Sequence, residues 1–328
     1  IEAIFLCASG RSHRTSKDIE LLKNQTPGFT VILSIEKNGT EEKIEINYTP
    51  ETKKRIKINE IPLKRIGDLM GHLNAVIFSP EDLFIIKQGP SERRRFIDIT
   101  ISQLRPSYFY DLQQYAKILV QRNTLLKNMS GRSEEEITLD IWDTHLVNTG
   151  TRIIEARRNF IKKLGELAAR RHEILSNKEE KLSLKYNPSV EIKDDEDREQ
   201  ITKKYMDLIK KNRNKEIFKG TSIFGPHRDD IDIMLNGVST KIYGSQGQQR
   251  TSVLSMKLAE IDLIKEETSE LPVLLLDDVM SELDAKRKGY LMESIKGIQT
   301  FITCTEKQIF NEDGRNASYF KVVNGEIY

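Results

Sequence analysis

The chain has 328 residues, of which 38% are hydrophobic and 31% are charged, and its formal net charge is +2. This length is sufficient for two domains, or for one domain with an insertion, each with a sizeable hydrophobic core. The near-neutral charge excludes a uniformly basic nucleic-acid-binding surface, so any DNA contact must come from local patches.

The first predicted element is a helix that begins at the first residue. Ile1, Ile4, Phe5 and Ala8 follow helical spacing, but no Ser, Thr, Asp or Asn precedes them as a cap. We interpret this start as a helix cut within its first turns, and we expect the natural protein to have further residues before Ile1. Residues 28–78 then alternate with a period of two around an Asn38-Gly39 turn, which predicts β structure that ends in a short buried strand at 74–79.

From about Ser91 the hydrophobic period becomes helical. A heptad seam with Arg122 at one of its positions is formed by Tyr108, Leu112, Tyr115, Leu119 and Leu126. After a polar break at 127–136, which includes Ser130-Gly131, apolar pairs recur every seven residues from Leu146 to Leu175. Two seamed helices around a polar loop predict an antiparallel helical hairpin, or short arm.

The second helix of this arm is basic, and its role has two open interpretations. It is either a solvated helix face or a track for DNA phosphates. Its basic residues are Arg152, Arg157, Arg158, Lys162, Lys163, Arg170, Arg171, Lys178 and Lys181. The charged stretch at 191–216 is predicted to be a helix that returns to the second lobe.

The last third of the chain predicts a hairpin and a βαβ unit. The hairpin turns at Asn236-Gly237, and a helix follows at about 247–267. A fully apolar strand at 272–276, a helix at about 285–296 and a strand at 300–304 form the βαβ unit of a parallel sheet.

Cysteine use and hydropathy narrow the class of protein. Cys7 and Cys304 each lie in an apolar run, and no Cys-x-x-Cys pair occurs, so two buried thiols in a reducing compartment are favoured over a metal site. The sequence contains no signal peptide and no apolar run of about 18 residues. We therefore expect a cytoplasmic protein with no membrane span.

Two motifs can carry chemistry. Asp277 and Asp278 end the apolar strand, where one carboxylate can hold Mg²⁺ beside a nucleotide's phosphates and the other can orient water; alternatively, the pair merely caps the next helix. The second motif, 32 residues before Asp277, is a Gly-containing turn with Ser245 at a helix N-terminus. Free N–H groups make such a turn a phosphate site, although it is also an ordinary capped helix start.

In combination these motifs resemble the RecF family of bacterial ABC/SMC-like ATPases. The matching runs are Ser245-Gln-Gly-Gln-Gln-Arg, Leu274-Leu-Leu-Asp-Asp-Val, Gly225-Pro-His-Arg-Asp-Asp, Gly10-Arg-Ser-His-Arg-Thr and Phe78-Ser-Pro-Glu-Asp-Leu. The resemblance extends from Ile1 to about Lys307. It implies an α/β ABC-type ATPase head of two lobes, with mixed and parallel sheet, at 1–90 and 216–328, and an inserted α-helical hairpin arm at 91–215.

The resemblance also implies a site shared between two subunits. ATP and Mg²⁺ would be the cofactors, with Asp277 on the metal and Asp278 as the catalytic acid. Nucleotide contacts and the dimer interface would involve Ser245, Gln246, Gly247, Gln248, Ser281 and Asp284. DNA contacts, as alternatives to solvated loops and helix starts, would come from Arg11, His13, Arg14, Arg93, Arg94, Arg157 and Arg158. Asp229 and Asp230 are interpreted as structural acids.

The implied function is ATP-dependent DNA binding in recombinational repair and replication restart. Such a protein would be a slow DNA-stimulated ATPase that dimerises on duplex or gapped DNA with a RecR-type mediator. Two departures stand out: Thr303-Cys304-Thr305 replaces the usual histidine, and no Gly-x-x-x-x-Gly-Lys-Ser/Thr loop occurs in the 328 residues. We therefore expect a truncated, inactive head. The alternatives are a nucleotide-independent DNA-binding adaptor and another SMC- or Rad50-type head.

Overall fold

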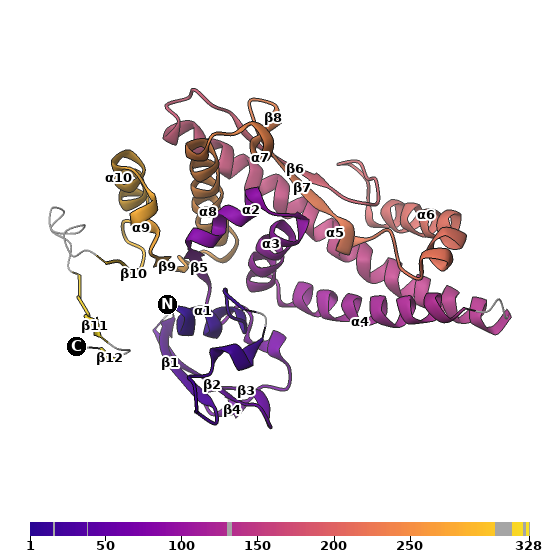
Figure 1. Cartoon of the computed structure of the whole chain (residues 1–328), viewed down its shortest axis with the longest axis horizontal. Helices are drawn as coiled ribbons and strands as arrows, with labels where there is room; N and C mark the ends of the chain where they lie inside the picture. Colours follow the sequence, from indigo (N-terminus) through magenta and orange to yellow (C-terminus); the bar gives the residue numbers. More distant parts are fainter. Residues whose placement is uncertain (16, 38, 130–132, 306–316, 324–325, 328) are drawn as a thin grey trace.

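The computed structural model describes residues 1–15, 17–37, 39–129, 133–305, 317–323 and 326–327. Asn38 of the predicted hairpin turn and Ser130-Gly131 of the predicted polar break lie outside these ranges. Figure 1 shows the first lobe around β1–β4, the second lobe around β6–β8, and a helical arm that extends away from both.

An antiparallel sheet with its strands in chain order forms the first lobe. Its strands are β1 (Phe29–Lys37), β2 (Thr40–Thr49), β3 (Lys53–Ile58) and β4 (Ile61–Pro62). Ile46 pairs with Val31 on one side and with Ile56 on the other, and this row packs against helix α1 (Glu2–Ser9). The alternation predicted for 28–78 is confirmed, because every second side chain enters this core.

A parallel sheet in the order β10-β9-β5 joins the lobes. Its strands are β5 (Ala75–Phe78), β9 (Val273–Asp277) and β10 (Thr300–Thr303), and the helices nearest to it in sequence are α8 (Gln246–Thr268), α9 (Val279–Glu282) and α10 (Ala285–Ser294). Leu274 and Leu276 are fully buried with Leu254 and Leu258 of α8. The predicted βαβ unit is therefore confirmed.

The second lobe contains an antiparallel sheet of β6 (Leu182–Asn187), β7 (Asp230–Leu235) and β8 (Val238–Ser239). The β7–β8 turn has positive φ at both Asn236 and Gly237, as predicted. Strand β6 was not predicted, and it lies in the range assigned to the arm. Its pattern of apolar and polar residues is short and surrounded by charged sequence, and pairing with β7 makes it a strand.

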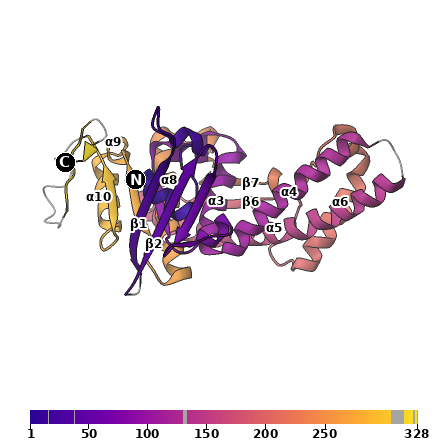
Figure 2. The same cartoon turned by 90° about the horizontal axis from the view of Figure 1, so that it is seen from below.

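Helices α4 (Pro106–Asn128) and α5 (Ser133–Leu175) form the predicted antiparallel hairpin (Figure 2). The helix at 191–216 is α6 (Arg198–Lys219), and it packs on both α4 and α5, so the arm has three helices. Helix α3 (Pro90–Leu104) connects the arm to the head. The shorter elements are η1 (Asp18–Leu21), η2 (Ile66–Leu69), η3 (Pro80–Leu83), α2 (Phe84–Lys87), η4 (Pro226–Arg228), α7 (Thr240–Tyr243), β11 (Val322–Val323) and β12 (Glu326–Ile327).

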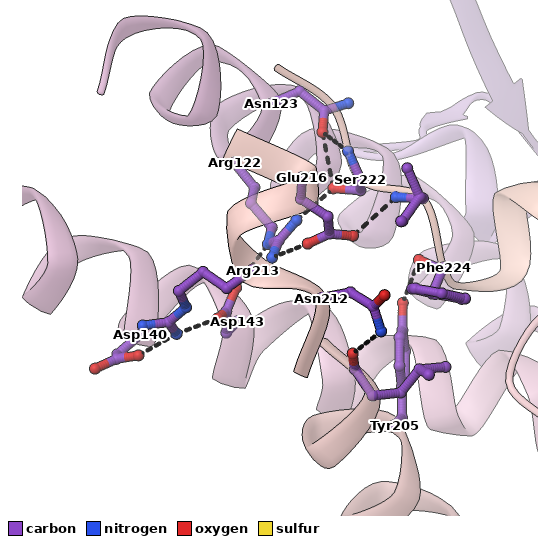
Figure 3. A network of polar contacts seen from close by, with 12 residues as sticks. Arg122, Asn123, Asp140, Asp143, Tyr205, Asn212, Arg213, Glu216, Ser222 and Phe224 are labelled. Atoms are coloured by element: carbon purple, nitrogen blue, oxygen red, sulfur yellow. Dashed lines mark hydrogen bonds and ion pairs between the residues drawn. The ribbon is translucent and has the colours of Figure 1, made fainter. Parts of the chain in front are cut away.

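The side chain of Arg122, which interrupts the heptad seam, is fully buried between the three arm helices (Figure 3). Its Nε donates to Asp143 Oδ1 of α5 at 2.6 Å, and its Nη2 donates to Glu216 Oε2 of α6 at 2.7 Å. Its Nη1 donates to Ser222 Oγ at 2.7 Å. Because a buried charge must be paired, these contacts fix the register of α6 against the hairpin.

One prediction about the cysteines is wrong. Cys7 is buried, but Cys304 is exposed because it follows the last residue of β10 at the open end of the strand. In the described part of the chain, no helix combines the length and the low polarity that crossing a bilayer requires.

Candidate functional site

The carboxyl ends of β5, β9 and β10 meet at one edge of the parallel sheet. Phe78 pairs with Leu276, and Asp277 pairs with Thr303, so the Ser79 turn, Asp277 and Thr303 are neighbours there. In open α/β sheets this is the edge at which ligands bind.

Asp277 lies at the centre of this edge. Its Oδ1 accepts a hydrogen bond from Thr303 Oγ1 at 2.8 Å, and its Oδ2 accepts one from Arg14 Nη2 at 2.6 Å. Burial alone would raise the pKa of Asp277, but the hydrogen bonds from Thr303 and Arg14 outweigh it and hold the pKa below its ordinary value. The carboxylate is therefore kept ionised.

Asp278 has a different environment. It adopts a left-handed backbone (φ 53°) and its backbone N–H donates to Thr303 Oγ1 at 3.0 Å. Its side chain is exposed, and within the described residues its carboxylate takes part in no hydrogen bond or ion pair. Ser281 Oγ donates to the Asp278 carbonyl at 2.8 Å, which ties the following turn to the acid pair.

Ser245 caps helix α8 with a capping box. Its Oγ accepts from the Gln248 N–H at 3.2 Å, and the Gln248 side chain accepts from the Ser245 N–H at 2.8 Å. Ser245 and Gln246 are exposed, while Gly247 is half-buried. No hydrogen bond between described residues joins this turn to Asp277 or Asp278, so a single chain presents the two motifs separately.

Arg287 of α10 connects the Ser245 turn to the loop after the acid pair. Its Nη2 donates to the Gly247 carbonyl at 3.1 Å and its Nε donates to Thr251 Oγ1 at 2.8 Å. It also forms an ion pair with Asp284, which caps α10 by accepting from the Arg287 N–H at 2.9 Å. Arg287 thus holds Gly247 and Asp284 in a fixed relation.

A pocket of about 400 Å³ lies beside the partners of Asp277. His13 lines it with its side chain 7% exposed, and Nε2 is 3.7 Å from Asp277 Oδ2. Neither ring nitrogen of His13 has a hydrogen-bond partner among the described residues. Burial lowers the pKa of His13, which favours the neutral ring. The buried Lys257 closes the pocket, paired with Glu260 at 2.5 Å.

Two of the residues proposed for DNA binding are buried and already paired, which corrects the prediction for them. Arg93 donates to both carboxylate oxygens of Asp230, at 2.6 and 2.9 Å. Arg157 pairs with Asp98 at 2.9 Å and with Asp229 at 3.3 Å. Because removing either guanidinium from its carboxylate would leave a buried charge unpaired, neither is free to contact phosphate.

Of the other five candidates, His13 has a mostly buried side chain, and the four arginines are at least partly accessible. Arg14 contacts Asp277, and Arg11 is exposed with its guanidinium 5.8 Å from the centre of the Phe109 ring. Arg94 donates to the Asp229 carbonyl, and Arg158 donates to the carbonyls of Lys193 and Glu196. Arg14 and His13 therefore lie next to Asp277, together with the buried part of the Gly10 turn. Arg158 lies on the arm, away from this site.

Comparison with known sequences decides the family. The chain is 55% identical over 330 residues to the DNA replication and repair protein RecF of Ruminiclostridium cellulolyticum, covering 100% of this chain and 89% of that protein. The chain belongs to the RecF family. The RecF of Acetivibrio thermocellus is 53% identical over 329 residues with the same coverage. A separate scan against family models finds no match.

Solved RecF structures share the fold. One titled as the recombination mediator protein RecF-ATP in the RecFOR pathway has a TM-score of 0.90 at 41% identity, covering 100% of this chain and 88% of that one. A second, titled RecF-ATPrS, has a TM-score of 0.91 at 41% identity and covers 99% and 86%. The fold is therefore that of a RecF head, an ABC-type ATPase fold.

Sequence reasoning missed three residues in this RecF-family site. The sequence marks Thr303 only as a departure from the usual histidine, predicts a DNA or phosphate contact for Arg14, and does not distinguish Arg287. Each makes its decisive contact with a residue at least 26 positions away, such as Thr303 with Asp277, and Arg14 is 263 positions from Asp277. The local sequence around a threonine after a strand, or around an arginine in a turn, does not indicate which distant residue it will contact.

Proposed function

We propose that this chain is an ATP-dependent DNA-binding protein of recombinational repair and replication restart. The observation that carries the proposal is the ionised Asp277 beside the unpaired carboxylate of Asp278, at the ligand-binding edge of a parallel sheet. Support comes from the solved structures of RecF-ATP and RecF-ATPrS, which match this fold at 41% identity.

The two acids would have different roles. Asp277 would hold Mg²⁺, directly or through water, since Mg²⁺ is commonly bound by one or two carboxylates together with substrate phosphates. When bound, the ion neutralises charge on those phosphates. Asp278 has a free carboxylate with which to orient or deprotonate water, and its reach is shorter than that of a glutamate. Because of this shorter reach we expect ATP hydrolysis to be slow, and we expect DNA to stimulate it.

The exposed Ser245 turn would serve a second copy of the chain. Ser245 and Gln246 are exposed at the N-terminus of α8, where the helix dipole is positive, as a phosphate site requires. Ser245, Gln246, Gly247 and Gln248 would therefore contact a nucleotide held by the partner, and Ser281 and Asp284 would line the interface. ATP-dependent homodimerisation follows, with duplex or gapped DNA and a RecR-type mediator as the further partners.

Light scattering tests the central claim. We would measure the molar mass of the chain and of its Asp278→Asn variant, each with and without Mg·ATP. The proposal expects ATP to shift the molar mass toward a dimer and Asp278→Asn to prolong that dimer, because hydrolysis is slowed. If no form responds to nucleotide while DNA binding persists, the proposal is wrong.

One observation favours a second function. The 328 residues contain no Gly-x-x-x-x-Gly-Lys-Ser/Thr loop. In many ATP-binding proteins the backbone N–H groups of that loop bind the phosphates of the nucleotide. A nucleotide-independent DNA-binding adaptor would need no such loop. In that case Asp277→Asn and Asp278→Asn would leave DNA affinity unchanged at every ATP concentration.

A further inference from the structure

The outward face of α6 carries five lysines that have no acidic partner among the described residues. They are all exposed and spaced so that they share one side of the helix: Lys203, Lys210, Lys211, Lys215 and Lys219. The opposite side of α6, which includes Tyr205 and Ile209, is fully buried against the hairpin. We call these five residues the lysine face.

The basic residues of the neighbouring helix behave differently. On α5, Arg152 pairs with Asp111, Arg171 with Asp262 and Lys163 with Glu267, so their charges are largely neutralised within the protein. On α6, Arg198 pairs with Glu155, Lys204 with Glu196, and Arg213 with Asp140 and Asp143. Three basic side chains of α5, those of Arg158, Lys162 and Arg170, also have no acidic partner among the described residues, against the five lysines of α6. Of the two helices, α6 therefore carries more unneutralised positive charge.

The lysine face also holds the most exposed large apolar side chain described in this chain. Phe218 is 90% exposed and lies three residues after Lys215 and one before Lys219. A solvated helix face has no need of an aromatic ring in that position. A ring among lysines offers a stacking surface for an unpaired base whose neighbouring phosphates bind the ammonium groups.

The positive surface continues beyond the end of α6. The Cγ of Lys127, at the end of α4, lies where a side chain on Gly220 would sit, so the exposed Lys127 adjoins Lys219. Acidic residues on the same side are Glu199 and Asp207, which are exposed and nearer the start of the helix. From Asn214 to Lys219, the exposed side chains of α6 are those of Asn214, Lys215, Phe218 and Lys219, and none of them is acidic.

We propose that the lysine face with Phe218 is a binding surface for DNA that contains unpaired bases, such as the single-stranded part of a gap. The lysines contact phosphates without regard to sequence, and Phe218 stacks on a base. This inference rests on the proposed DNA-binding function but assigns it to residues outside the ATP site.

Fluorescence anisotropy with labelled DNA tests the lysines on the chain as it stands. Lys211→Glu with Lys215→Glu should weaken binding to both a duplex and a gapped duplex by about tenfold or more, and should make the slope of log affinity against log salt less steep by about 1 to 2. The matched control is Lys23→Glu with Lys64→Glu, which makes the same charge change at exposed first-lobe lysines. Circular dichroism establishes that both variants remain folded.

Phe218→Ala separates stacking from charge. It should weaken binding to gapped DNA by about fivefold or more, leave duplex binding within twofold, and keep the salt dependence unchanged. Phe218→Trp should restore the gapped-DNA affinity. Equal effects of Phe218→Ala on both DNAs would overturn the assignment of an unpaired base.

The outcomes distinguish this inference from the proposed function. If the unmodified chain binds DNA and the lysine variant matches its control, the lysine face does not bind DNA, and an acidic protein partner becomes its occupant. The DNA-binding function would survive that result. If the unmodified chain binds neither DNA at low salt, with or without Mg·ATP, both the inference and the proposed function are wrong.

Discussion

Arg14 donates a 2.6 Å hydrogen bond from Nη2 to Oδ2 of Asp277, a residue 263 positions later in the chain. This contact places a cation on the carboxylate that we assign to Mg²⁺. Arg14 is 56% exposed, so its side chain can leave without uncovering a buried charge. Asp277 is therefore ionised before a metal arrives and is accessible once Arg14 moves.

Arg14→Gln should raise the pKa of Asp277 toward its ordinary value, as measured by NMR titration of the carboxyl carbon. The loss of stability should be below about 1 kcal/mol, since the pair is partly solvated. Because the folded pKa is depressed, the stabilisation is present above the unfolded pKa of 3.8 and is lost as pH falls through the folded pKa. An unchanged pKa would show that Arg14 does not hold it down.

Arg287→Gln should weaken ATP-dependent dimerisation by about tenfold. The guanidinium positions Gly247 and Asp284 relative to each other, and a charged hydrogen bond contributes about 1.5–3 kcal/mol. Dimer mass against ATP concentration is the measurement. Lys286→Gln, an exposed neighbour, is the control and should have no effect. Partial rescue by Arg287→Lys would separate positioning from simple destabilisation.

Arg122→Ala should reduce the free energy of unfolding by about 3–5 kcal/mol in urea denaturation, because Asp143 and Glu216 would remain buried without their cation. The control is Arg152→Ala, whose pair with Asp111 is partly exposed and whose removal should cost about 1 kcal/mol or less. Similar losses in the two variants would mean that water reaches the Arg122 network.

His227 should make the protein less stable in mild acid. Its Nε2 donates to the Ser222 carbonyl at 3.1 Å and its Nδ1 accepts from the Tyr115 hydroxyl at 2.8 Å, an arrangement that requires the neutral ring. Burial, together with nearby cations such as Arg228 and Arg94, lowers the pKa of His227 to about 4. Between the ordinary pKa of 6.5 and 4, the unfolded chain takes up a proton that the folded chain does not.

Stability should therefore fall by about 1.4 kcal/mol per pH unit from this group as the pH drops below 6.5. Urea denaturation at pH 7, 6 and 5 measures the slope. His227→Gln keeps a polar side chain without a titratable group and should flatten the slope by that amount. An identical slope in the variant would place the acid sensitivity elsewhere.

The elements of the fold follow largely from local sequence. Alternation around Ile44 and Ile46 specifies strands, the unbroken apolar run before Asp277 specifies a buried parallel strand, and the capping box at Ser245 marks the start of α8. These signals are local because each depends on spacing within one element. The motifs that indicate an ABC-type head lie at the ends of these elements, so they too can be recognised from the local sequence.

Only the tertiary structure decided which charges are available. By sequence Arg93, Arg157 and Arg14 are alike, yet the first two are buried against Asp230, Asp98 and Asp229, and the third lies on Asp277. Strand β6 and the packing of α6 on the hairpin were decided in the same way. Sequence gives the sign of a charge, but its partner and its access to water depend on residues brought close by folding, and those determine whether it stabilises the protein or binds a ligand.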